Sequence, residues 1–352
     1  MTKRVGIRDV AREAGVSPAT VSLVLNDRAA TRIPASTQDR VRRAALDIGY
    51  SPNSVARSLR TRTTRTIGLI SDQIATTPYA VRMIEAVQDG ARAHGHLVFL
   101  VSTGAERSLE REAVAALRDQ QVDGLIYACM WHRDVVVPQG MPPGSVVLDG
   151  RPDRAGYPAV VPDDRRGAEA AVQALVDAGH RRIAYVDIDE APSPLASGLR
   201  HEGYLAVLAA AGIDADPALH VKGSADAVGA RDAASRVLEL PPGRRPTALF
   251  CFNDRMAMGA YSAARRHGLE IPTDLSVVGY DDQQLIAAEL DPPLTTVALP
   301  HYDMGRWAVE VLLGSREAPP DQGVMLMPCP LITRESVGPP PTEQKELGRR
   351  QT

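Results

Sequence analysis

The sequence has few cysteines, no long apolar run and no secretion signal. Its three cysteines are Cys129, Cys251 and Cys329. An odd, widely spaced set predicts buried free thiols in a reducing compartment and not a disulfide framework. No run approaches the roughly 18 apolar residues that a membrane helix needs, and the basic N-terminus lacks an apolar stretch. We therefore expect a cytoplasmic protein that makes no contact with a membrane.

The motifs of common catalytic sites are also missing. The sequence has no G-x-x-x-x-G-K-[ST], no G-x-S-x-G and no H-E-x-x-H. The carboxylates of Asp163-Asp164 and Asp281-Asp282 are adjacent, and because neighbouring side chains usually point apart, a glycosidase pair is disfavoured. Three histidines without metal-ligand spacing are interpreted as solvated loop residues: His94, His96 and His132. We expect no enzyme activity, no metal and no cofactor.

Charge is divided unevenly along the chain. Residues 1–65 carry 13 Lys and Arg against 5 Asp and Glu, whereas the remaining residues carry 27 against 38. A basic N-terminal head on an acidic body indicates that the head alone binds phosphates.

The head shows three short helical patterns. The first has an apolar stripe at Ile7, Val10, Ala11 and Ala14, and Gly15 can end it in the left-handed conformation. Ser17 is a suitable N-cap for a second helix with Pro18 at its first position. The faces predicted to be buried in the second and third helices are Val21, Val24 and Leu25, then Val41, Ala44, Ala45 and Ile48. Periodicity alone would equally suit a plain helical bundle, and the charge favours a DNA-binding one.

After Thr66, short apolar runs alternate with helical segments. Examples are Ile67–Ile70, Gly124–Ala128 and Ser276–Tyr280. Continuous apolar runs separated by helices predict parallel strands that are covered on both faces. Roughly 270 residues exceed one core, so we expect two doubly wound subdomains. Polar residues follow several strands at their carboxyl ends, where such sheets bind ligands, and Asp, Asn and Arg suit a ligand rich in hydroxyls.

The head resembles the lactose/galactose repressor (LacI/GalR-type) family of transcription regulators. The matching residues are Asp9-Val10-Ala11, Ala14-Gly15-Val16-Ser17, Thr20-Val21-Ser22, Asn26, Gly49-Tyr50, Pro52-Asn53, Ala56-Arg57 and Leu59. The resemblance implies a helix-turn-helix whose second helix enters the major groove of DNA.

In this family's arrangement, two groups of residues on the second helix meet DNA. Pro18, Ala19 and Leu23 would face base edges. Thr20, Ser22 and Asn26 would support backbone contacts. Many members have Arg where this chain has Leu23, and Leu offers only apolar contact, for example to a thymine methyl. We therefore predict a changed preference at that base pair. Gly6 replaces the usual Thr N-cap of the first helix.

The ten residues from Ser51 to Arg60 form a candidate hinge helix. Isolated helices below roughly 12–15 residues are marginal in water, so we expect this segment to be disordered or fluctuating away from DNA. The resemblance implies that two hinge helices meet in the minor groove of a palindrome, that Asn53 and Ala56 contact DNA, and that Leu59 wedges a base step. A plain linker is the alternative.

The body resembles a periplasmic sugar-binding fold. Six residues are the effector-binding candidates that this resemblance implies: Asp72, Asp149, Arg200 in the motif R-x-x-G-Y, Asn253, Asp281 and His301. Any single Asp could instead cap a helix, and Asp254 and Asp282 are interpreted as caps or solvated residues.

The predicted organisation has four parts. A helix-turn-helix head spans 5–50, a hinge and linker 51–66, a two-subdomain body of periplasmic-binding type 67–337, and a disordered, Pro-rich tail 338–352. The tail has no leucine heptads, so we expect a homodimer. The predicted function is a repressor of a palindromic operator, controlled by a small sugar-like effector. Use of a corepressor and a sugar-binding module without DNA binding remain alternatives.

Overall fold

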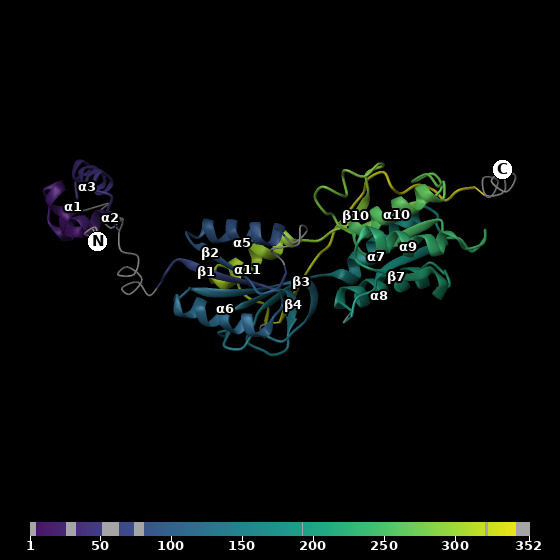
Figure 1. The fold of residues 1–352 in the computed structure, drawn as a ribbon, viewed down its shortest axis with the longest axis horizontal. Coiled ribbons are helices and arrows are strands. Elements are labelled where there is room, and N and C mark those ends of the chain that lie inside the picture. The colour runs from purple at the N-terminus through teal and green to yellow at the C-terminus, as the bar shows by residue number, and fades with distance from the viewer. Residues whose placement is uncertain are drawn as a thin grey trace. The chain divides into compact units, whose positions relative to one another are not determined.

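The computed structural model describes residues 5–25, 33–50, 63–73, 81–191, 193–320 and 323–342. The chain divides into two compact units, Met1–Thr64 and Arg65–Thr352. Figure 1 shows a small all-helical unit and a larger unit of sheets and helices. The two units, called the head and the body below, are described separately.

The head contains three helices: α1 (Ile7–Ala14), α2 (Pro18–Leu25) and α3 (Ala35–Asp47). Gly15 ends α1 with φ 63° and ψ 39°, a left-handed conformation that Gly adopts at little cost. The amide of Val16 donates to the carbonyl of Ala11, which closes the turn. The sharp turn predicted between the first two helices is therefore present.

One small core joins the three helices. Val10, Val21, Val24 and Val41 have no exposed surface. The three stripes expected from periodicity thus meet, with Leu25 and Ile48 half-buried at the edge of the core. From α3, the guanidinium of Arg40 donates to the carbonyl of Ala14 at 2.9 Å and fixes the end of α1.

The first subdomain of the body is a parallel six-stranded sheet. Its strands are β1 (Thr66–Ser71), β2 (Leu97–Ser102), β3 (Gly124–Val135), β4 (Val146–Pro152), β5 (Ala159–Pro162) and β11 (Val324–Met327), in the order β11-β5-β4-β3-β1-β2. Helices α5 (Val81–Ala93) and α11 (His301–Leu312) contribute to the core on one face, and α6 (Arg107–Asp119) to the core on the other. Because both faces are covered, the first halves of the central strands, Leu125–Cys129 of β3 and Val146–Leu148 of β4, are buried and apolar, as predicted.

The second subdomain repeats this architecture. Its strands are β6 (Ile183–Ile188), β7 (His220–Gly223), β8 (Ala248–Cys251), β9 (Ser276–Asp281), β10 (Thr295–Ala298) and β12 (Leu331–Ile332), in the order β12-β10-β9-β8-β6-β7. Among the strands described in this sheet, β12 alone is antiparallel to its neighbour. The helices are α7 (Asp164–Asp177), α8 (Leu195–Ala210), α9 (Ala227–Leu238) and α10 (Asp254–Arg266), with a short 3-10 turn at Pro217–Leu219.

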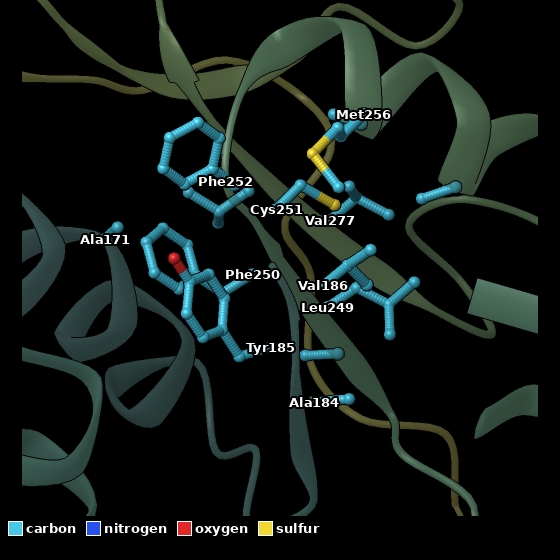
Figure 2. Packing of buried hydrophobic residues seen from close by; sticks show 14 of the residues in the cluster. Ala171, Ala184, Tyr185, Val186, Leu249, Phe250, Cys251, Phe252, Met256 and Val277 are labelled. Carbon is cyan, nitrogen blue, oxygen red and sulfur yellow. The ribbon is translucent and has the colours of Figure 1, made fainter. Parts of the chain in front are cut away.

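The core of the second subdomain is rich in rings. Tyr185 on β6 and Phe250 on β8 stack with their centroids 4.9 Å apart, and Phe252 follows on the same strand end (Figure 2). Cys251 is buried beside Met256 (Figure 2). All three cysteines are free thiols, as predicted from their spacing.

The chain passes between the subdomains three times. The passages follow β5, β10 and β11. Two hydrogen bonds tie them together: the amide of Asp163 donates to the carbonyl of Met327 at 2.8 Å, and the amide of Ala298 donates to the carbonyl of Pro330 at 2.8 Å. The ends of strands from both sheets therefore meet at these passages.

The start of the expected disordered tail is attached to the body. The amide of Gly338 donates to the hydroxyl of Ser276, and its carbonyl lies 2.9 Å from Nε2 of His180. The expectation of disorder from residue 338 onward was therefore wrong for this residue, because a buried histidine and serine need its backbone groups as partners. Residues 343–352 lie outside the described residues. None of the described helices has the length and hydropathy of a membrane span.

Candidate functional site

In the head, a hydrogen-bonded cap fixes the start of α2. The hydroxyl of Ser17 accepts from the amide of Thr20 at 3.1 Å, and the two hydroxyl oxygens lie 2.9 Å apart. Ser17 is thus the N-cap that the sequence predicted, with Pro18 as the first helical residue. The Thr20 side chain is held by this cap.

The outward face of α2 is small and uncharged. Pro18 and Ala19 are exposed, and Leu23 exposes 38% of its surface, whereas Thr20 and Ser22 are half-buried. The side chains expected to read bases are therefore presented to solvent on one helix. The other DNA-binding candidates, Asn26, Asn53, Ala56 and Leu59, lie outside the described residues.

In the body, Arg200 is the centre of a buried charged cluster. It is 3% exposed, and its Nε donates to Oδ1 of Asp164 at 2.8 Å. Its Nη1 donates to the carbonyl of Phe252 and lies 3.8 Å from Oδ1 of Asp281. The guanidinium carbon lies 3.6 Å from the ring centroid of Tyr280, so the cation is also stabilised by an aromatic face.

Asp164 and His132 are members of this cluster that sequence reasoning missed. Nδ1 of His132 lies 2.8 Å from Oδ2 of Asp164, and both residues are buried. Burial alone would raise the pKa of Asp164, but the charge of Arg200 and the contact with His132 lower it below its usual range. The interpretation of His132 as a solvated loop residue was wrong, because it lies in β3, where the β3–β4 register shifts between Ala128 and Arg133, and contacts Asp164 of the second subdomain.

The remaining residues of the R-x-x-G-Y motif have structural roles. A Cβ on Gly203 would lie 2.5 Å from the carbonyl oxygen of Arg165, so this Gly permits α8 to approach α7 closely. The hydroxyl of Tyr204 donates to the carbonyl of Ile183 at 2.8 Å. Only Arg200 of this motif reaches the charged cluster.

Asp281 closes the cluster at the end of β9. Its Oδ2 accepts from the side-chain amide of Gln283 at 2.8 Å, and its φ is 104°. Burial raises the pKa of Asp281 to about 7, although the charge of Arg200 opposes this shift. Its carboxyl therefore exchanges a proton near neutral pH.

The neighbouring Asn253 and Asp254 are used within the protein. Oδ1 of Asn253 accepts from the amide of Met256 at 2.8 Å, which makes Asn253 the N-cap of α10. Asp254 is fully buried and accepts from the hydroxyl of Thr296 at 2.6 Å and from the amide of Gln283. The interpretation of Asp254 as a solvated residue was wrong, because its carboxylate connects α10 to β10 and to the segment after β9.

Asp282, in contrast, pairs with a partner at the surface. Its Oδ1 lies 2.6 Å from Nη2 of Arg334, and both side chains are partly exposed.

Asp149, at the end of β4, is buried with a left-handed backbone. Its φ is 60°, and its Oδ1 has no hydrogen-bond partner among the described residues. Burial raises the pKa of Asp149 well above its usual range; the charge of Asp164 raises it further and that of Arg200 lowers it. Asp149 therefore belongs to the electrostatic surroundings of the Arg200 cluster.

Asp72 is held by its own subdomain. Its carboxylate accepts from the amide of Met130 and from Nη2 of Arg133, both at 3.2 Å. It lines a cavity of about 570 Å³ with Trp131 and Arg133, and residues 190, 191 and 193–195 of the second subdomain also line this cavity.

His301 and Asp281 line a second cavity, of about 610 Å³. His301 is the first residue of α11 and is buried, and Leu299 and Met327 from two passages also contribute. The structure thus brings Arg200 and Asp281 into contact and places Asp149 near them. His301 shares a cavity with Asp281, and Asp72 lines the other cavity.

Two family models match the chain. Residues 6–53 match the model of bacterial regulatory proteins of the lacI family, and residues 172–337 match a periplasmic binding protein-like domain. A relative from Vibrio atlanticus (strain LGP32), the HTH-type transcriptional repressor PurR, is 35% identical over 319 residues. These residues make up 87% of this chain and 90% of the relative.

Solved structures give the same result. The lac repressor dimer bound to operator and the anti-inducer ONPF is 28% identical with a TM-score of 0.76, over 96% of this chain and 100% of that one. The complex of the transcriptional regulator CelR with cellobiose is 29% identical with a TM-score of 0.64, over 95% and 100%.

The helix-turn-helix head and the paired parallel sheets define a DNA-binding transcriptional repressor that a small molecule controls. The chain belongs to the lacI family of bacterial regulatory proteins. Both the predicted fold class and the resemblance are confirmed.

Proposed function

We propose that this protein is a cytoplasmic, homodimeric repressor that binds a palindromic operator and responds to a sugar-like effector. The observation that carries the proposal is the outward face of α2, which exposes Pro18, Ala19 and Leu23 next to a capped N-terminus in a basic head. A helix with these properties fits the major groove, and the basic surroundings supply phosphate contacts. The related CelR complex with cellobiose supports a sugar.

The proposed operator contacts come from two segments. Pro18, Ala19 and Leu23 meet base edges, with Leu23 against an apolar group such as a thymine methyl. Thr20, Ser22 and Asn26 support the backbone contacts. From the hinge, Asn53, Ala56 and Leu59 meet the minor groove, and Leu59 is the wedge.

The proposed effector site is the charged cluster between the subdomains. Arg200 and Asp281 form its centre, and Oδ1 of Asp149 has no hydrogen-bond partner in the part of the chain that the structure describes. We also assign three residues around this cluster to the effector site: Asn253, Asp72 and His301. A ligand that contacts both subdomains changes their relative positions, because it favours the arrangement that it binds best.

The junction with the hinge is firmly attached to the first subdomain. The amide of Arg65 donates to Oδ2 of Asp123 at 2.7 Å, and its carbonyl accepts from the amide of Leu97 at 2.9 Å. A movement of the first subdomain therefore moves residue 65 and the hinge that precedes it. A coupling of about 1–3 kcal/mol per site is enough to alter operator occupancy.

Operator selection from random DNA tests the proposal directly. We expect full-length protein to enrich a palindromic site, and a chain without residues 1–61 to lose DNA binding while keeping ligand affinity. Addition of the ligand then shows the sign of control: release of DNA identifies an inducer and tighter binding identifies a corepressor. No enrichment of any palindrome would contradict the proposal.

A further inference from the structure

Three strands of the first sheet begin side by side where the body begins. β1 lies between β2 and β3, and all three run parallel. One residue directly precedes each strand: Arg65 before β1, His96 before β2 and Asp123 before β3. These three residues are called the junction cluster below. The hinge and linker end here, so the cluster is the base from which the hinge starts.

A single carboxylate oxygen joins the junction cluster. Oδ2 of Asp123 accepts from the amide of Arg65 at 2.7 Å and lies 3.2 Å from Nε2 of His96. The amide of Asp123 also donates to the carbonyl of Thr66 at 2.8 Å. Because His96 and Asp123 precede strands on opposite sides of β1, their contact links the two neighbours of the strand that follows the hinge.

The backbone of Arg65 needs this support. Its φ is 55°, in the left-handed region that residues other than Gly rarely adopt and that persists only where surrounding contacts enforce it. Both of its backbone polar groups are bonded to neighbouring segments: the amide donates to Asp123, and the carbonyl accepts from the amide of Leu97 at 2.9 Å. A weaker contact at Asp123 therefore loosens the residue at which the hinge joins the body.

The hydrogen bonds of His96 are complete only when its ring carries two protons. Nδ1 lies 2.9 Å from the carbonyl oxygen of His94, and Nε2 faces the carboxylate of Asp123. Both oxygens can only accept, so each ring nitrogen needs a hydrogen, and the neutral ring has just one. The side chains of His96 and Asp123 are only 16% and 11% exposed, so water competes little for their contact. The interpretation of His96 as a solvated loop residue was therefore wrong.

Other charged groups around the junction cluster are paired or exposed. Arg92 of α5 pairs with Asp89 at 3.4 Å, and Arg316 after α11 pairs with Glu310 at 2.9 Å. Three further titratable or charged side chains belong to exposed residues and are screened by water and salt: those of Arg65, His94 and Asp119. His96 is thus the group whose proton acts directly on the carboxylate of Asp123.

We propose that His96 and Asp123 are positioning residues for operator binding, and that the proton on His96 makes the repressor bind its operator more tightly in mildly acidic conditions. The inference rests on the proposed function. A hinge that starts from a fixed residue loses less conformational freedom when it orders on DNA, so a closed junction cluster favours the bound state. When the pH rises and His96 loses its proton, one ring nitrogen faces an oxygen without a hydrogen, and operator affinity falls.

Hydrogen exchange of the ligand-free, full-length protein tests the junction cluster without DNA. Exchange of the amide of Arg65 is followed by residue-resolved mass spectrometry at about pH 6 and about pH 8, and is corrected for the intrinsic rate. We expect about fivefold less protection at the higher pH in the wild type. His96→Gln should show less than about a twofold difference, because its amide still donates to Asp123 but takes up no proton. Equal protection of Arg65 at both pH values in the wild type would overturn the inference.

Operator affinity tests the coupling to DNA. Full-length protein is titrated onto an operator enriched from random DNA, at the same two pH values and fixed salt, by fluorescence anisotropy. We expect the wild-type affinity to fall by about fivefold more than that of His96→Gln as the pH rises. Because the two proteins share every other titrating group, their difference isolates His96. The matched control His94→Gln removes the exposed neighbouring imidazole and should keep the wild-type profile. Identical profiles for the wild type and His96→Gln, or loss of the profile in His94→Gln, would overturn the inference.

A purely structural role for the pair predicts a different result. His96→Gln and Asp123→Asn would then lower operator affinity by the same factor at both pH values. Under the inference, Asp123→Asn keeps an oxygen for the amide of Arg65 but removes the charge that attracts the imidazolium, so it abolishes the pH dependence. Operator binding that is insensitive to His96 would sink this inference alone, whereas a protein that binds no palindrome would sink the proposed function and this inference with it.

Discussion

The head and the body carry their functional groups in opposite ways. In the head, the side chains proposed to meet base edges, Pro18, Ala19 and Leu23, are uncharged and exposed on one short helix, and the positive charge lies elsewhere in the head sequence. In the body, Arg200, Asp164 and Asp281 are charged, buried and drawn from three distant segments. A substitution in the exposed face of the head should therefore change specificity and spare stability, whereas one in the buried cluster should change both.

The largest expected effect is on the body. Arg200→Met leaves Asp164 and Asp281 buried without their cation, and we expect the free energy of unfolding to fall by about 3–5 kcal/mol. Trp131 and Trp307 are the only tryptophans and both lie in the body, so urea unfolding followed by their fluorescence reports on the body alone. The matched control Arg166→Met, whose side chain is 83% exposed, should have little effect. If Arg200→Met lowered the free energy of unfolding by less than about 1 kcal/mol, the cluster would behave like exposed ion pairs and not like a buried network.

Helix packing next to the cluster is expected to give the next largest effect. Gly203→Ala places a Cβ 2.5 Å from the carbonyl oxygen of Arg165 and forces α7 and α8 apart, at a cost of about 1–3 kcal/mol. Gly198→Ala in the same helix has nothing within 4 Å of its Cβ and should stabilise by about 0.5–1 kcal/mol. In thermal unfolding, Gly203→Ala should lower the Tm and Gly198→Ala should raise it. Equal shifts would contradict the close contact.

The pH dependence of stability should distinguish the body from the head. The pKa of Asp281 is about 7 in the folded body, above the usual value for Asp, so the folded state holds this proton more tightly than the unfolded state. The resulting stabilisation is complete below about pH 4 and is lost as the pH rises through 7, by at most about 1.4 kcal/mol per pH unit. Asp281→Asn has no titrating carboxyl at this position. Its free energy of unfolding should therefore rise relative to that of the wild type between pH 5 and pH 8. Urea midpoints at the two pH values measure this gain, and a constant difference would refute it.

The smallest effect on stability is expected on α2. Leu23→Arg changes a side chain that is 38% exposed, so the unfolding midpoint of the head should not move. Operator selection should instead shift toward guanine at one base pair, by about 1–3 kcal/mol, because Arg pairs with guanine through two hydrogen bonds. Leu46→Arg on α3, where Leu46 is 80% exposed, adds the same charge and should leave the selected sequence unchanged. An identical selected site for both variants would remove Leu23 from the base contacts.

The difference between the two units also explains what could be predicted from the sequence. In the head, helix ends and faces depend on residues within a few positions, such as Ser17 with Thr20 and Gly15 after α1. Local chemistry and the 3.6-residue period therefore sufficed for its fold. The alternating strands and helices of the body were predicted for the same reason.

The buried cluster was only partly predictable. The motif around Arg200 and the strand end at Asp281 marked two members, which the structure places 3.8 Å apart. Asp164 was discounted because its sequence neighbour is also an Asp, although helix α7 turns the two side chains to different surroundings. His132 was missed because nothing local reveals that the β3–β4 register shifts next to it or that its ring contacts Asp164 of the other subdomain.

One titration tests the central claim that the body controls DNA binding by the head. Full-length protein is titrated onto the selected palindromic operator at fixed salt, by fluorescence anisotropy, with and without a sugar that stabilises the protein in a thermal-shift screen. We expect the sugar to change operator affinity by about 5- to 150-fold, with no comparable change on a scrambled duplex. Equal affinity for the operator and the scrambled duplex, or an operator affinity that saturating sugar leaves unaltered, would contradict the account.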